Sequence, residues 1–165
     1  PNLGARFRQD VRDARGSAGS GNTGEDACFT EECLVTMADG SKKNINLVVA
    51  GDEILGQEGP AEVLENNAIR TTTYLYSINE STHFVTDSHP FLTEAGWKAF
   101  NARRSARLHP ELNITQLQEG DVLVKESGTE VLEIFSFVEK TLPVFNLNVT
   151  GNDTYIVNDY IVHNK

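Results

Sequence analysis

The 165-residue sequence is poor in several features, and each shortage excludes a class of protein. It has only two cysteines, Cys28 and Cys33, too few for a disulfide scaffold, and neither lies in a CxxC pair or among closely spaced histidines. No apolar run reaches the roughly 18 residues of a membrane span, and no signal peptide is evident. The net charge of −10 disfavours nucleic acid as a partner. We therefore expect no metal, cofactor, nucleic-acid or membrane partner.

What is present is the composition of a globular chain, 39% hydrophobic and 23% charged, at a length that suits one domain. Residues 16–24 have the composition of a linker, and the spacing of Phe7, Val11 and Ala14 before it predicts a short helix. Two loose basic clusters, at 6–15 and 103–107, are interpreted as solvated surface.

From Cys28 onward the apolar pattern favours β-structure. Strands are predicted at 34–37, 74–78, 83–86, 130–134, 144–149, 154–157 and 160–162. Residues 101–113 are polar and basic around His109-Pro110, and we interpret them as a surface loop. The predicted fold class is therefore all-β.

An internal repeat divides this β region in two. Residues 51–63 and 120–131 share a Gly-Asp pair before apolar residues, then a glycine turn and a valine, and residues 83–87 are echoed by 154–159. Two paired markers in the same order predict a duplicated β unit with pseudo-twofold symmetry. The aspartates of the Gly-Asp pairs, Asp52 and Asp121, are expected to cap turns.

Three segments could carry chemistry. Cys28 opens the first, ahead of an apolar strand and an Asp-Gly turn; Thr86-Asp87-Ser88-His89 is the second; and a Gly-Asn-x-Thr-Tyr strand leads to a terminal Val-His-Asn at 162–164. In this order, around a duplicated β unit, they resemble the Hint superfamily of Hedgehog-type domains and inteins. With no room for a homing endonuclease, the chain looks most like a bacterial intein-like domain or a mini-intein.

This resemblance spans residues 28–164. It leaves residues 1–27 as a flanking segment with its linker and residue 165 as a flanking residue on the other side. It implies an all-β, flattened, horseshoe-like Hint fold with Cys28 and Asn164 close together on central strands. It also implies a monomer that acts in cis on its own flanking polypeptide, in the manner of domains from secreted or surface bacterial proteins.

The resemblance also implies roles at the first scissile bond. Cys28 would attack the carbonyl of Ala27 and turn the amide into a thioester, which needs a nucleophilic thiol, a distorted peptide and an acid for the departing amine. Thr86 would hold that peptide by hydrogen bonds, and His89 would serve as the acid. Asp87 and Ser88, which precede this histidine, would orient it.

At the other end, the side-chain amide of Asn164 would attack its own carbonyl, forming a succinimide and releasing Lys165. His163 would polarise the carbonyl or protonate the leaving amine. The site thus comprises Cys28, Thr86, His89, Asp153, His163 and Asn164, with Asp87, Ser88 and Asn146 in support.

Three positions depart from the intein pattern. Inteins that splice have Cys, Ser or Thr where this chain has Lys165, so the thioester is expected to pass to water, a thiol or an external amine. Asn146 stands where an Asp is common, and Asp153 where a His is common. We therefore expect cleavage before Lys165 to be slower than cleavage at Cys28, or to depend on protonation of Asp153.

Two other interpretations remain open. A Hedgehog-type domain would pass its thioester to a sterol, but that branch lacks the terminal Asn, and no sterol-recognition segment is evident. A structural or binding domain that has lost its activity would explain the changes at Asn146, Asp153 and Lys165. Cys33 is interpreted as a packing residue, with a redox partner for Cys28 as the alternative, and Trp97 as a core residue.

Overall fold

A computed structural model describes residues 27–164 of the chain. The strands are β1 (Phe29–Thr30), β2 (Leu34–Thr36), β3 (Lys42–Asn44), β4 (Glu53–Gly56), β5 (Gly59–Tyr76), β6 (Val85–Thr86), β7 (Phe91–Thr93), β8 (Gly96–Ala99), β9 (Thr115–Gln116), β10 (Val122–Lys125), β11 (Gly128–Val131), β12 (Phe137–Val149), β13 (Thr154–Val157) and β14 (Tyr160–His163). A 3-10 turn, η1 (Ile45–Leu47), and a short helix, α2 (Ala102–Leu108), accompany them. The all-β prediction is confirmed, whereas the helix and linker expected before residue 27 lie outside the described residues.

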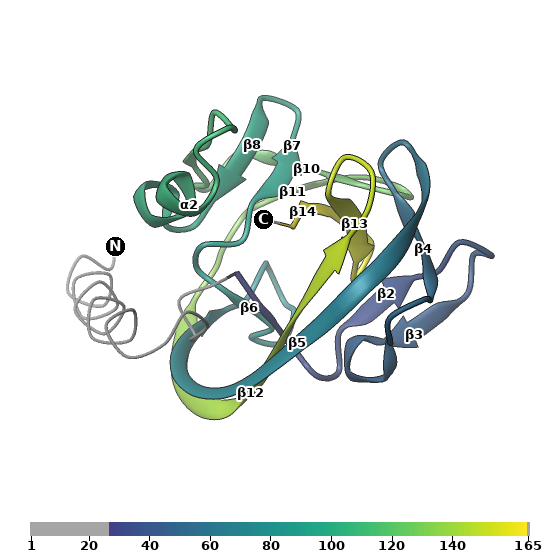
Figure 1. Cartoon of the computed structure of the whole chain (residues 1–165). Helices are drawn as coiled ribbons and strands as arrows, with labels where there is room; N and C mark the ends of the chain where they lie inside the picture. The colour runs from purple at the N-terminus through teal and green to yellow at the C-terminus, as the bar shows by residue number, and fades with distance from the viewer. Residues whose placement is uncertain (1–26, 165) are drawn as a thin grey trace.

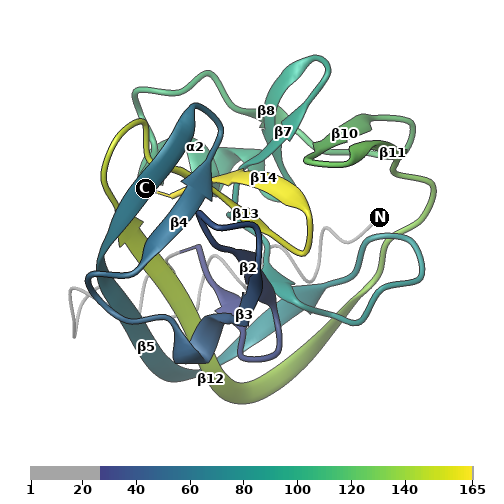
Figure 2. The ribbon, with the colours of Figure 1, turned by 90° about the vertical axis from the view of Figure 1, so that its right-hand side faces the viewer.

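The strands form two sheets. The smaller has the order β12-β1-β6-β5-β4, and the larger runs β3-β2-β13-β14-β10-β7-β8-β9 with β11 beside β10. The two long strands, β5 and β12, pair antiparallel from Phe137 opposite Tyr76 to Val149 opposite Val63. In Figures 1 and 2 they bend together around one end of the molecule, which gives the domain its curved outline.

The predicted duplication is present at the level of single hydrogen bonds. In the first half, the Gly51 N–H donates to the Val63 carbonyl at 2.9 Å, and the Val63 N–H donates to the Asp52 carbonyl at 2.9 Å. In the second half, Gly120 and Asp121 make the same two bonds with Leu132, both at 2.8 Å.

This pairing corrects one detail of the repeat. Leu132 is the counterpart of Val63, one residue later than the Val131 that the sequence comparison matched to it. Val131 is the residue opposite Val122 in the hairpin.

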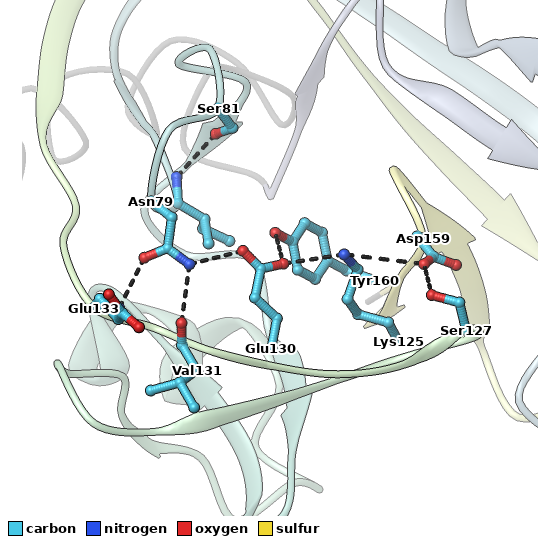
Figure 3. Close-up of polar contacts among 10 residues, drawn as sticks. Asn79, Ser81, Lys125, Ser127, Glu130, Val131, Glu133, Asp159 and Tyr160 are labelled. Carbon is cyan, nitrogen blue, oxygen red and sulfur yellow. Dashed lines mark hydrogen bonds and ion pairs between the residues drawn. The ribbon is translucent and has the colours of Figure 1, made fainter.

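A polar network fixes the second-half hairpin to the loop after β5. The Asn79 side chain donates to Glu130 Oε2 at 2.7 Å and to the Val131 carbonyl at 2.9 Å (Figure 3). Glu130 also accepts from the Tyr160 hydroxyl at 2.8 Å and from Lys125 at 3.1 Å. Asn79 holds a left-handed backbone, with φ of 55°, which asparagine tolerates better than most residues. The two halves are therefore joined by side chains as well as by strand pairing.

The interpretation of residues 101–113 as a surface loop is wrong. They contain α2, which Asn101 caps at the N-terminus by accepting from the Arg104 N–H. The helix ends at Leu108, and its C-cap His109 comes just before Pro110. Of the basic cluster at 103–107, Arg103 and Arg107 are exposed as expected, but Arg104 is buried. Among the described residues, no helix is long or apolar enough to cross a membrane.

Candidate active site

Cys28 is buried and lies directly before β1, where its peptide is held by β6. The Cys28 N–H, which is the nitrogen of the bond to Ala27, donates to Thr86 Oγ1 at 2.9 Å. The Thr86 N–H donates back to the Cys28 carbonyl at 3.0 Å. These bonds arise because β1 and β6 pair antiparallel, with Phe29 opposite Val85. Thr86 therefore contacts the peptide that the sequence assigned to it.

His89 is fully buried in the loop between β6 and β7. Its ring lies 4.2 Å from that of Phe29, the residue after Cys28, and 6.4 Å from that of Tyr155, centroid to centroid. Burial lowers the pKa of His89 well below its usual value, and the nearby charges of His109 and His163 act in the same direction. His89 is therefore neutral at neutral pH. A hydrogen bond with the backbone at Pro90 opposes this lowering of the pKa in part.

The Asp87 carboxylate contacts Arg104 of α2 and the Asn101 cap of that helix. One carboxylate oxygen accepts from Arg104 Nη1 at 2.6 Å and the other from Asn101 Nδ2 at 3.1 Å, while its carbonyl accepts from the Asn101 N–H at 2.8 Å. The ion pair is almost completely buried. Asp87 thus ties α2 to the loop that carries His89. Ser88, beside it, is also fully buried.

The C-terminal motif lies at the end of β14. His163 pairs with Thr154 of β13, and its N–H donates to the Pro90 carbonyl at 3.2 Å. Asn164 follows, and its N–H donates to the carbonyl of Asp153, a residue with φ of 62°. The Asn164 side chain is 1% exposed, and its amide atoms have no hydrogen-bond partner within the described part of the chain. Asp153 therefore holds the backbone of the asparagine that would cyclise.

One cavity joins the two ends of the described chain. It has a volume of about 420 Å³. Its lining residues are Ala27, Glu65, Asn67, Leu108, His109, Asn146, Asn148 and Asn164. Ala27 and Asn164 are 137 residues apart in the sequence yet line the same space, and Asn146 forms part of the wall, opposite Asn67 in the β5–β12 ladder. The sequence expectation that the Cys28 end and Asn164 would lie together agrees with this arrangement.

His163 lies between two aromatic rings. Its ring meets that of Trp97 edge-on, with centroids 5.3 Å apart, and that of His109 edge-on at 5.7 Å. Burial lowers the pKa of His163, and the carboxylates of Asp153 and Glu111 partly oppose that effect. Trp97 is only half-buried, so its interpretation as a core residue is wrong, and it packs on His163 instead.

Two residues of this region were missed from the sequence. His109 was interpreted as part of a surface loop, and Arg104 as solvated surface. His109 is 1% exposed and lines the cavity, while Arg104 pairs with Asp87. The sequence did hold one signal, the pattern Asn-x-x-Arg at 101–104. An asparagine is a favoured N-cap residue, so this pattern indicates a helix that begins after Asn101 and contains Arg104.

Cys33 is separated from Cys28 in the core. Its side chain packs in the main apolar cluster, whereas Cys28 packs with Leu75 and Val144 in a second, smaller one. Burial raises the pKa of Cys33 to about 12, so its reactive thiolate is scarce at neutral pH. No disulfide joins the two cysteines, which agrees with the interpretation of Cys33 as packing.

Comparison with known proteins places this architecture in a class. No protein-family model and no curated protein matches the sequence. Among solved structures, it is similar to the bacterial intein-like domain from Clostridium thermocellum, with 25% identity over 83% of this chain and 98% of that one, and a TM-score of 0.65. A DnaB intein from Synechocystis sp. PCC 6803 has 25% identity over 84% and 99%, with a TM-score of 0.58. The gp41-1 intein has 20% identity over 84% and 98%, with a TM-score of 0.63.

The chain therefore has the Hint fold of inteins and bacterial intein-like domains, as its motifs predicted. The match covers nearly the whole of each of these small proteins, so this chain has the dimensions of a minimal Hint domain.

Proposed function

We propose that this chain is an autoprocessing domain that cleaves two bonds of its own backbone, each in a single turnover. The first bond joins Ala27 to Cys28, and the second joins Asn164 to Lys165. One observation carries the proposal: residues at the two would-be scissile bonds, Ala27 and Asn164, line a single cavity although they stand at opposite ends of the fold. A packing role alone gives no reason for two chain ends to meet in a polar cavity beside two buried histidines, His109 and His163.

The first step uses Cys28, Thr86 and His89. Neutral His89 accepts the thiol proton of Cys28, whose sulfur attacks the Ala27 carbonyl carbon. The bond from that carbon to the Cys28 nitrogen then breaks, and His89 returns the proton to the departing amine. Thr86 supports this step because its hydroxyl holds that nitrogen. Water, a thiol or an external amine then releases residues 1–27 from the thioester.

The second step uses Asn164 and His163. The Asn164 side-chain nitrogen attacks the Asn164 carbonyl carbon, the bond to Lys165 breaks, and a succinimide forms. His163 carries the proton to the amine of Lys165. The unpartnered, buried amide of Asn164 supports this role, because few competing hydrogen bonds restrain it.

Splicing is disfavoured, because Lys165 has neither the hydroxyl nor the thiol that would accept the acyl group. We also propose that the domain acts in cis as a monomer. Cleavage after Asn164 is expected to be slower than thioester formation, because Asp153 stands where inteins commonly have a histidine. Release of Lys165 ahead of residues 1–27 at neutral pH would contradict that order.

The test is the intact mass of the purified chain over hours, with and without added thiol. Loss of residues 1–27 on adding thiol is expected for the natural sequence and should disappear in Cys28→Ala. Cys33→Ala is the matched control, since it removes the other buried thiol and should still cleave. Loss of Lys165 with the mass of a succinimide should disappear in Asn164→Ala. Unchanged masses over days would instead favour an inactive structural module.

A further inference from the structure

Two buried histidines and one exposed carboxylate meet beside the end of β14, and the proposed reaction uses only one of them. One ring nitrogen of His109, one of His163 and one carboxylate oxygen of Glu111 all lie within 4.8 Å of one another. The two histidine rings meet edge-on, with centroids 5.7 Å apart. His109 also lines the cavity that Ala27 and Asn164 share. No sequence pattern reveals this group, because its members lie far apart in the chain.

We propose that these three residues hold one proton between them and serve the Asn164 step as an acid–base pair. Charged His163 gives a proton to the departing amine of Lys165. Neutral His109 accepts a proton from the side-chain amide of Asn164. Glu111 is a positioning residue whose carboxylate stabilises the charged form of His163. The proposal deepens the proposed function and rests on it, because it assumes that Asn164 cyclises.

Burial makes the two imidazoles share a single proton. His109 is 1% exposed and His163 is 6% exposed. Two positive charges this close repel strongly where water is excluded, so the second proton binds much less readily than the first. The two titrations are therefore coupled, and over a range of pH the pair holds one proton. In that state one imidazole can donate and the other can accept, which are the two roles that amide cyclisation needs.

The surrounding charges decide which imidazole holds the proton. Burial lowers the pKa of His163, and the carboxylates of Asp153, before β13, and Glu111, after α2, oppose this effect. The remaining titratable group on this side is His89 of the β6–β7 loop, which stays neutral because burial lowers its pKa. The proton is therefore assigned to His163, the residue that precedes Asn164 and the amine that leaves.

Local structure holds the carboxylate beside the rings. The Leu112 N–H donates to the His109 carbonyl at 3.0 Å and closes a turn over 109–112. Pro110 occupies the second position of this turn, which proline favours, and Glu111 occupies the third. The turn therefore keeps Glu111 next to His109, with its exposed side chain on the solvent side of the pair.

The step balances without any further reactant. The Asn164 side-chain nitrogen gives one proton to His109 as it bonds to the main-chain carbonyl carbon of the same residue. The bond from that carbon to the Lys165 nitrogen breaks, and this nitrogen receives the proton of His163. A proton then returns from His109 to His163, whose ring nitrogens are close enough for one water to bridge. The pair is left as it began.

The pH dependence of Lys165 release tests the pair, measured by intact mass between pH 5.5 and 8.5. A bell-shaped profile is expected, because the rate falls when the pair loses its single proton or gains a second. Glu111→Gln removes a negative charge, so it should move the whole bell to lower pH by roughly half a unit, the effect of one charge about 5 Å away in water. Release then falls about threefold on the alkaline side and does not fall on the acid side. Glu111→Asp should leave the bell near its natural position.

Two controls separate this shift from structural damage. Glu119→Gln changes an exposed glutamate outside the group and should leave the profile where it was. Thiol-induced release of residues 1–27 reports the Cys28 step, and in every variant it should stay within about twofold of its natural rate at pH 7.5. Equal loss of Lys165 release at all pH values in Glu111→Gln, or no change at any, overturns the role of Glu111.

The role of His109 is tested by His109→Gln in the same assay. The variant should slow release of Lys165 at least tenfold and lose the acid limb of the bell, because that limb reports protonation of His109. An unchanged rate or a persisting acid limb overturns its role as the base. If the natural chain never releases Lys165, the proposed Asn164 step fails and the pair fails with it. If the natural chain and all variants release it alike, only the pair fails.

Discussion

The two halves of the duplicated fold share a frame and differ in what they attach to it. In each, a glycine with φ near +95° precedes an aspartate: Gly51 (95°) before Asp52, and Gly120 (98°) before Asp121. Each aspartate accepts from the N–H three residues earlier, at 3.0 Å in the first half and 2.8 Å in the second, and from a lysine on a neighbouring element. The hairpin after each starts and ends at matching positions.

Beyond the hairpins the halves diverge. In the second half, β13 returns to β14 through a tight turn at Asn158-Asp159, both with positive φ as such hairpin turns require. In the first half, the corresponding return from β6 to β7 is the loop that holds Asp87 and His89. Only this half also carries α2, docked by a buried ion pair. The shared frame therefore sets the shape, and His89 of the proposed chemistry lies where the halves stop being alike.

The largest effect is expected from removing the buried ion pair between Arg104 and Asp87, which belongs to the first half. Arg104→Ala should lower the free energy of unfolding by about 3–5 kcal/mol, because it leaves the buried Asp87 carboxylate without its cation. Urea unfolding of the non-cleaving background, Cys28→Ala with Asn164→Ala, measures the loss.

Arg103→Ala is the control for that experiment. It lies one residue away on the same helix and is exposed, and alanine favours helix, so its effect should stay within about 0.5 kcal/mol. Equal losses for the two arginines would show that the ion pair does not hold α2 in place.

A second difference between the halves is the buried histidine of the first. The pKa of His89 is lowered in the folded chain, so near pH 6 the unfolded chain binds a proton that the folded chain does not. Stability is therefore full above about pH 6.5 and falls as the pH drops below it, by up to about 1.4 kcal/mol per pH unit for each such proton. The lowered pKa of His163 acts with the same sign.

Urea unfolding of the non-cleaving background between pH 7.5 and 5.5 measures this slope. His89→Gln should flatten it, leaving the part that belongs to His163. Acidic groups whose pKa is lowered, such as Asp52 and Glu130, titrate at lower pH and do not enter this window. An identical slope with and without His89 would mean that its proton binding does not change on folding.

The same contrast explains what the sequence could reveal. The Gly-Asp turns depend on residues within about a dozen positions, so their pattern predicted them, although no strand was predicted for β4 or β10. The full length of β5 was missed, because its middle is polar and is a strand only through its ladder with β12. Arg104 was missed because its burial depends on Asp87, 17 residues away. The terminal motifs were recognised by resemblance, whereas α2 had only the local signal of its Asn101 cap.

The smallest effect tests how alike the two frames are. Asp52→Ala and Asp121→Ala each remove the acceptor of one turn N–H and one lysine, and each should cost about 1 kcal/mol in unfolding free energy. Asp121→Ala should cost more, because its partner Lys98 is 13% exposed while Lys43, the partner of Asp52, is 35% exposed and better screened by water. Urea unfolding of both variants in the non-cleaving background decides the order. A larger loss at Asp52 would mean that the first-half turn contributes more to the free energy of unfolding than the second-half turn, despite its greater exposure.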